Sequence, residues 1–78
     1  MYTEEKAKAL NFINECENLE PLKEVLTQIT NPDYSHSDRW SAVFDVVFDN
    51  YSYLTPSERG AIITGLVYLI EDKEEILI

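Results

Sequence analysis

The side chains with the most reactive chemistry in this 78-residue sequence are its single cysteine, Cys16, and its single histidine, His36. A cysteine thiolate beside a histidine base can form a nucleophilic pair for covalent catalysis. Cys16 lies on the apolar stripe of a helical pattern, whereas His36 lies in a polar segment, and no oxyanion-hole motif accompanies either residue. We therefore expect Cys16 to pack in the core and His36 to serve at the surface or as a helix cap.

Metal and cofactor chemistry has little support. Residues 33–38 place oxygen-bearing side chains at alternate positions, like the start of an EF-hand calcium loop, but the loop's glycine position holds Asp38 and its final glutamate position holds Phe44. A structural zinc site needs more cysteine and histidine ligands than one of each. Acid–base catalysis needs a cleft that shifts a carboxyl pKa, and a bundle this small leaves little volume for one. The sequence therefore predicts no metal, no cofactor and no enzymatic activity.

Acidity is the strongest property of the composition, with 15 Asp and Glu against 6 Lys and Arg and a formal net charge of -9. Such a surface repels phosphate backbones and anionic membranes, and it attracts cationic partners from a distance. We therefore expect a basic protein partner, with no direct nucleic-acid or membrane contact. The alternative is that the charge serves solubility alone.

Three aspartates, Asp38, Asp45 and Asp49, occur at positions i, i+7 and i+11 of a helical pattern. On a helix they share one side and lie roughly 10 and 6 Å apart along the axis. Tyr51 and Tyr53 follow directly. Carboxylates that steer association, beside aromatic anchors, are typical of surfaces that block a cationic site, so these five residues are predicted to bind the partner. Alternatively, the tyrosines close the core and the aspartates are only solvated.

A second predicted partner-binding group is an acidic run at the end of the last helical pattern, formed by Glu71, Asp72, Glu74 and Glu75. Negative charge at a helix C-terminus opposes the helix dipole, and this unfavourable placement indicates a function for these acids. The alternative is that a frayed helix end tolerates the charge. The apolar residues 76–78 follow. We expect this tail to dock on the body of the protein, to pair with another copy or to meet a partner.

Four helical patterns must position these groups. The first covers about residues 3–18, with Thr3 as its expected cap and apolar residues at helical spacing. The second is short, begins near Pro21 and ends before Asn31-Pro32, because a residue that precedes proline is pushed out of the helical region.

The third pattern begins after a cap at Ser35 or Ser37 and runs to about Asn50. Its apolar residues form one broad apolar face. These residues are Trp40, Val43, Phe44, Val47, Phe48 and Tyr51.

The fourth pattern has the clearest start, because Thr55-Pro56-Ser57-Glu58 combines a threonine cap, a proline at the first helical position and a glutamate three residues after the cap. We expect this helix to continue into residues 71–75 and to lie at the centre of the fold. Gly60 and Gly65 leave a low surface on it, for another helix of this chain or for a partner.

These patterns predict an all-α fold, a compact bundle of three to four short helices, in one domain over residues 1–78. One cysteine cannot form an internal disulfide. The first residues lack the features of a signal peptide, and no apolar stretch approaches the roughly 18 residues of a membrane span. The expected location is the cytoplasm.

The start Tyr2-Thr3-Glu4, ahead of a helical pattern, is similar to that of nuclease-colicin immunity proteins. The chain lacks their tyrosine-rich Ser-Asp-Leu-Ile-Tyr-Tyr-Pro stretch, so no family is assigned. The leading hypothesis is a small acidic inhibitor that occludes a basic partner, a nuclease or other nucleic-acid-binding enzyme, of the immunity-protein or phage anti-defence type. The alternative is a homo-oligomeric helical adaptor or regulator without charge mimicry, for which a homodimer is the simplest form.

Overall fold

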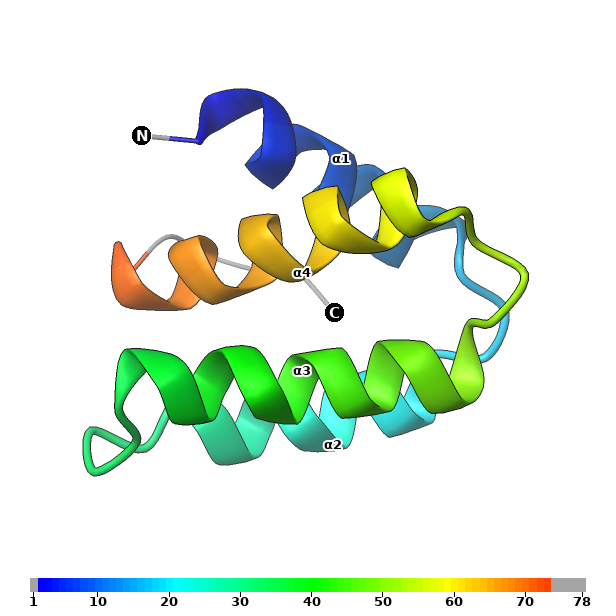
Figure 1. The fold of residues 1–78 in the computed structure, drawn as a ribbon. Coiled ribbons are helices and arrows are strands. Elements are labelled where there is room, and N and C mark those ends of the chain that lie inside the picture. Colours follow the sequence, from blue (N-terminus) through cyan, green and yellow to red (C-terminus); the bar gives the residue numbers. More distant parts are fainter. Residues whose placement is uncertain (1, 74–78) are drawn as a thin grey trace.

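The computed structural model describes residues 2–73, and these form a bundle of four α-helices without a β-strand (Figure 1). The predicted all-α fold is therefore confirmed. Within the described range no helix is long and apolar enough to cross a membrane. The helices are α1 (Thr3–Glu15), α2 (Glu20–Ile29), α3 (His36–Asn50) and α4 (Pro56–Glu71).

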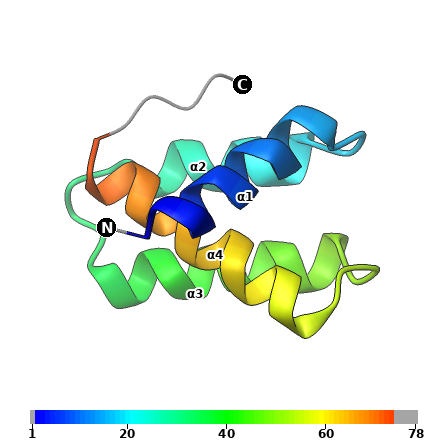
Figure 2. The ribbon, with the colours of Figure 1, turned by 90° about the horizontal axis from the view of Figure 1, so that it is seen from above.

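Helix α4 is the central helix, as its apolar sequence predicts. It packs against α1 on one side and against α3 on the other, and α2 packs against α3. Figure 2 shows α1 crossing over α4, so the two helices diverge toward the C-terminus of α1. Of the two glycines in α4, Gly65 is buried where α1 crosses, whereas Gly60 is exposed. Of the two roles predicted for these glycines, Gly65 therefore makes room for another helix of this chain.

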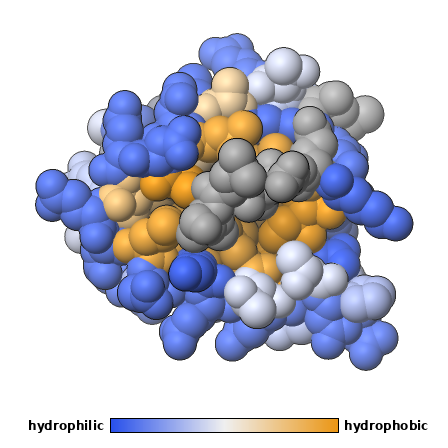
Figure 3. All heavy atoms as spheres, turned by 180° about the vertical axis from the view of Figure 1, so that it is seen from behind, coloured by the Kyte–Doolittle hydropathy of each residue, from blue (hydrophilic) through white to orange (hydrophobic). Residues whose placement is uncertain are grey.

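The core is made of aliphatic side chains from all four helices, together with Tyr51 from the segment that follows α3. On the face opposite to that of Figure 1, hydrophobic residues gather in the middle and hydrophilic residues form most of the margin (Figure 3). The buried apolar residues that α2 and α4 contribute form the largest part of the core: Leu22, Val25, Leu26, Ile29, Ile62, Ile63, Leu66, Val67 and Leu69.

Helices α3 and α4 both begin at side-chain caps. The Ser35 hydroxyl accepts a hydrogen bond from the Asp38 amide at 3.1 Å, so Ser35 rather than Ser37 caps α3. The Thr55 hydroxyl accepts one from the Glu58 amide at 3.2 Å, and the Glu58 carboxylate accepts one from the Thr55 amide at 3.0 Å. This reciprocal pair is the predicted capping box, and it fixes the first turn of α4.

The ends of α1 differ from the prediction. Tyr2, not Thr3, is the N-cap, with a left-handed backbone (φ 56°) and no side-chain cap bond. The helix ends at Glu15 rather than near residue 18, because Cys16 has an extended backbone and Leu19 already caps α2. The chain needs these intervening residues to turn from α1 into α2.

The end of α4 also differs from the prediction. The helix ends at Glu71, Asp72 is its C-cap, and Lys73 has a left-handed backbone (φ 58°), as residues that terminate helices often do. An extension of α4 into residues 72 and 73 is therefore wrong. Glu74, Glu75 and the apolar tail at 76–78 lie outside the described residues.

Candidate functional site

The broad apolar face of α3 divides into two rows, of which only one is buried. Val43 and Val47, with Tyr51 beyond the helix end, are buried in the core. The second row remains exposed, at 38% for Trp40, 39% for Phe44 and 53% for Phe48. An α-helix turns about 100° per residue, so these two rows project from neighbouring sides, and α2 and α4 enclose only the first.

The exposed row, Trp40, Phe44 and Phe48, is named here the aromatic ladder. Its rings are stacked, with centroids 5.3 Å apart and planes 16° apart for Trp40 and Phe44, and 5.8 Å and 18° for Phe44 and Phe48. This spacing lies in the range of favourable aromatic pairs. Three stacked rings on one helix give the protein a continuous apolar surface.

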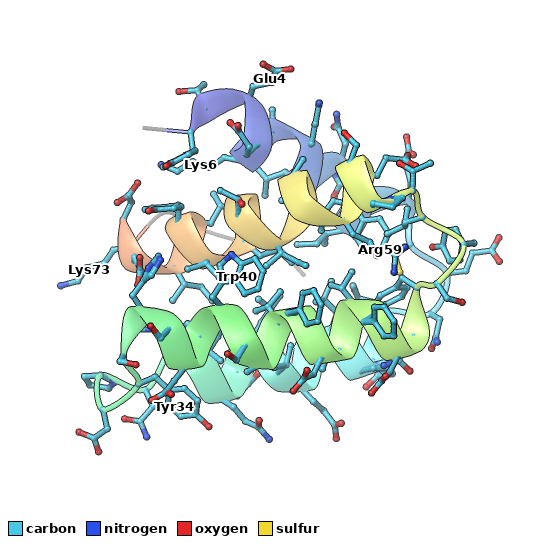
Figure 4. The ribbon with its side chains drawn as sticks, in the orientation of Figure 1. Glu4, Lys6, Tyr34, Trp40, Arg59 and Lys73 are labelled. Atoms are coloured by element: carbon cyan, nitrogen blue, oxygen red, sulfur yellow. The ribbon has the colours of Figure 1, made fainter. Side chains whose placement is uncertain are left out.

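Arg59 of α4 closes one end of the aromatic ladder. Its guanidinium carbon lies 5.3 Å from the centre of the Phe48 ring, within the range of a cation–π interaction. Within residues 2–73 no carboxylate forms an ion pair with Arg59, and its Nε atom is buried without a hydrogen-bond acceptor. Figure 4 shows Trp40 and Arg59 toward opposite ends of the seam between α3 and α4.

The predicted row of aspartates lies beside the aromatic ladder. Asp38, Asp45 and Asp49 are all exposed. Asp45 and Asp49 directly follow Phe44 and Phe48, so they lie roughly 100° further round α3. None of the ion pairs within residues 2–73 involves these aspartates. We name these three residues the carboxylate row. No described cationic side chain forms an ion pair with them, so their negative charge is uncompensated within residues 2–73.

The two tyrosines of the predicted site have different environments. Tyr51 is only 1% exposed, its ring packs edge-on against Phe12 at 5.1 Å, and its hydroxyl donates a hydrogen bond to the Asn18 carbonyl. Burial, aided by the Cys16 thiol, raises the pKa of Tyr51 above its usual value of 10. Tyr51 is therefore a core residue and not a surface anchor. Tyr53 is 72% exposed, but it lies beside α1 rather than on the face of the aromatic ladder.

The second acidic group is occupied by contacts within the chain. Glu71 accepts a hydrogen bond from His36 Nδ1 at 2.8 Å and pairs with the Arg39 guanidinium at 3.4 Å. Asp72 pairs with Lys6 at 2.5 Å, and this hydrogen bond lowers the pKa of Asp72. Both carboxylates thus fasten the end of α4 to distant helices, so they are not a free acidic surface. Glu74 and Glu75 of the same predicted group lie outside the described residues.

Cys16 and His36, the two residues with the most reactive side chains, lie at different elements of the fold. His36 caps no helix with its side chain, but it begins α3 and contacts Glu71, whereas Cys16 is half-buried beyond the end of α1. In the part of the chain that the structure describes, no cluster of three or more His, Cys, Asp or Glu residues is arranged to hold a metal ion.

The aromatic ladder and Arg59 are the site residues that sequence reasoning missed. The sequence did contain a sign that part of α3 is exposed. At 100° per residue, its apolar residues cover an arc of roughly 140°, which is wider than the roughly 100° stripe that suffices to face a core. The excess width marks apolar side chains that a small bundle leaves exposed. Arg59 carried no comparable signal, since its place over Phe48 depends on how α4 packs on α3.

Comparison of the chain with family models, with curated proteins and with solved structures gives no match. The candidate site is therefore defined by its geometry alone. It comprises the aromatic ladder, Arg59 and the carboxylate row on one exposed side of α3 and its seam with α4.

Proposed function

We propose that this chain is a small acidic inhibitor that binds a basic protein through α3 and occludes the partner's nucleic-acid-binding site. The observation that carries the proposal is the aromatic ladder lying beside the uncompensated carboxylate row. Aromatic side chains supply most of the binding energy at many interfaces, whereas carboxylates accelerate encounter with a cationic surface. An immunity protein or a phage anti-defence protein would use such a face.

The distribution of ion pairs supports this role. Glu71 and Asp72 are compensated by cations of the same chain, whereas Asp38, Asp45 and Asp49 are not. The carboxylate row spans roughly 16 Å along α3 at 1.5 Å per residue, which is long enough to meet more than one cationic side chain. A net charge of -9 adds a long-range attraction for a basic partner.

The experiment begins with capture of binding proteins at low salt from the native host, followed by their identification by mass spectrometry. Association and dissociation rates are then measured at increasing salt for the wild type and for the double variant Asp45→Asn/Asp49→Asn. The matched control is Glu24→Gln/Asp33→Asn, which removes the same charge from exposed positions on α2 and its following loop. Circular dichroism checks that every variant is folded.

The proposal expects association to slow with added salt, since steering is screened over a Debye length of about 8 Å at physiological ionic strength. It expects the variant of the carboxylate row to lose on-rate relative to the control, and Phe44→Ala to speed dissociation. Added wild-type protein should also release nucleic acid from the partner. A partner that binds equally at low and high salt and ignores these substitutions would rule out the inhibitor.

The second candidate function is a homodimeric adaptor or regulator, and Arg59 is the observation that favours it. This cation ends an apolar ladder and has no carboxylate partner within residues 2–73. A second copy packed ladder to ladder would bring its own aspartates near Arg59. Light scattering distinguishes the two functions, because a dimer that Phe44→Ala converts to a monomer supports the adaptor.

The inhibitor proposal includes a cytoplasmic location, where a basic enzyme of this class would meet nucleic acid. A single cysteine with no disulfide partner in the chain agrees with a reducing compartment. Fractionation of the native host, followed by detection of the protein with an antibody, tests this part of the proposal.

A further inference from the structure

A cavity of about 460 Å³ is lined by residues from the C-terminal half of α1 and the first turns of α4. The ribbons of these two helices diverge in this region (Figure 2). This volume falls within the roughly 300 to 1,000 Å³ that is typical of ligand sites. The cavity is separate from the aromatic ladder, because none of the ladder residues lines it. It therefore raises the question of a second binding site.

The inner lining of the cavity is apolar. Phe12 and Leu54 are half-buried, Ile62 is buried, and all three contribute to the lining. Tyr53 lines the cavity as well, with most of its side chain exposed, and its ring packs edge-on against the Tyr51 ring at 6.4 Å. An aliphatic chain in the cavity would contact Phe12, Leu54 and Ile62, and a planar cation would contact the face of the Tyr53 ring.

Negative charge prevails among the lining residues. Glu15 ends α1 and Glu58 lies in the first turn of α4. The Thr55 backbone amide and hydroxyl lower the pKa of Glu58, so its carboxylate is charged at neutral pH. Lys8 is the cation of the lining and also acts on Glu58, but its nearest carboxylate is Glu4 at 3.5 Å. Two carboxylates against one lysine leave the cavity with a net charge of -1.

We propose that this cavity binds an arginine side chain. Its aliphatic stem would cover Phe12, Leu54 and Ile62, and its guanidinium would lie between the Glu15 and Glu58 carboxylates, against the Tyr53 ring. Arginine fits better than lysine because its planar guanidinium both stacks on aromatic rings and donates to carboxylates in a fixed geometry. The inference rests on the proposed function for one point, that a basic partner supplies the arginine.

The probe is N-acetyl-argininamide, added to the ¹⁵N-labelled full chain while amide chemical shifts are recorded. The expected result is saturable shifts at residues that line the cavity. N-acetyl-citrullinamide has nearly the same shape without the charge, and it should bind at least about tenfold more weakly, since hydrogen bonds between charged groups are stronger than those of a neutral donor. Glu15→Gln and Tyr53→Ala should each weaken argininamide binding at least severalfold, whereas Glu24→Gln should not change it.

Glu15→Gln is a suitable variant because a negative charge at the C-terminus of α1 does not stabilise the helix, so the fold should be retained. Equal affinity for the citrulline compound, shifts centred on α3, or no saturation at all would each overturn the inference. The outcome is independent of the proposed inhibitor, since Asp45→Asn/Asp49→Asn should leave argininamide binding unchanged. Loss of salt-steered association in that variant, without argininamide binding by the wild type, would retain the inhibitor and remove only the arginine site.

Discussion

Gly65 of α4 faces the backbone of Glu5 in α1 so closely that a side chain has no room there. An ideal Cβ atom at Gly65 would lie 2.2 Å from the Glu5 carbonyl oxygen and 2.8 Å from the Ala9 Cβ atom. Real Cβ atoms essentially never approach within 3.0 Å, and a backbone carbonyl cannot swing away as a flexible side chain can. Gly60, in the same helix, has nothing within 4 Å of its ideal Cβ position.

Replacing each of the two glycines with alanine should change the stability of the protein in opposite directions. Gly65→Ala should destabilise the fold by roughly 1 to 3 kcal/mol, because α1 must shift to relieve the overlap. Gly60→Ala should instead stabilise the protein by up to about 1 kcal/mol, since alanine favours the helix and fits the open space. Urea denaturation of both variants measures these changes. Equal effects of the two substitutions would mean that α1 does not approach α4 at Gly65.

The capping box at the start of α4 predicts the effect of Thr55→Ala. Loss of the threonine hydroxyl removes the acceptor for the Glu58 amide, at a cost of about 0.5 to 2 kcal/mol. Thr27→Ala is the control, because Thr27 lies inside α2 and its hydroxyl donates to the Lys23 carbonyl within the same helix. The control should be neutral or slightly stabilising in the same denaturation experiment. An unchanged midpoint for Thr55→Ala would show that the cap does not stabilise α4.

The lowered pKa values of Glu58 and Asp72 predict how the stability of the fold depends on pH. The Thr55 backbone amide and hydroxyl lower the pKa of Glu58, and the hydrogen bond from Lys6 lowers that of Asp72, from ordinary values of 4.5 and 3.8. Because each pKa is lower in the folded state, the stabilisation is complete above the ordinary values and is lost as pH falls through the folded-state values. The melting temperature should therefore fall as the pH decreases below about 4.5.

Single substitutions test whether Asp72 and Glu58 cause this loss of stability at low pH. Asp72→Asn and Glu58→Gln should each reduce the dependence of the melting temperature on pH, while Glu24→Gln should leave it as in the wild type. Glutamine at position 58 still accepts the hydrogen bond from the Thr55 amide, so the capping geometry survives. A wild-type pH profile for both carboxylate variants would indicate that other groups govern acid unfolding.

Local signals explain which parts of the fold were predictable from the sequence. The capping box, the Ser35 cap and the spacing of apolar residues act within a few positions, so α2, α3 and the start of α4 follow from the sequence. The shared side of Asp38, Asp45 and Asp49 follows from helical geometry alone. The alternative that the tyrosines close the core holds for Tyr51, which continues the phase of Val43 and Val47.

Tertiary contacts explain what the sequence did not reveal. The acidic end of α4 opposes the helix dipole, and from the sequence alone this placement indicates a function. In the structure, Glu71 is instead satisfied by His36 and Arg39, and Asp72 by Lys6, which is 66 positions away in the chain. The exposure of the aromatic ladder likewise depends on where α4 and α2 pack on α3. No pattern within a single helix contains that information.

The last prediction separates the two tyrosines that the sequence grouped together. Tyr51→Phe removes the hydroxyl that donates to the Asn18 carbonyl, so it should cost roughly 0.5 to 1.5 kcal/mol in urea denaturation. Tyr53→Phe is the matched control and should change stability very little, because that side chain is 72% exposed and no described residue accepts a hydrogen bond from its hydroxyl.

The different positions of Tyr51 and Tyr53 also determine how a loss of partner binding in their variants is interpreted. Tyr51→Ala should cost about 3 to 5 kcal/mol, as truncation of a large buried aromatic residue does, and partner binding would then be lost through unfolding. Tyr53→Ala should retain the fold, so that any loss of binding reports a lost contact. Equal stability of Tyr51→Phe and Tyr53→Phe, together with a folded Tyr51→Ala protein, would contradict the core position of Tyr51 and return it to the interaction surface.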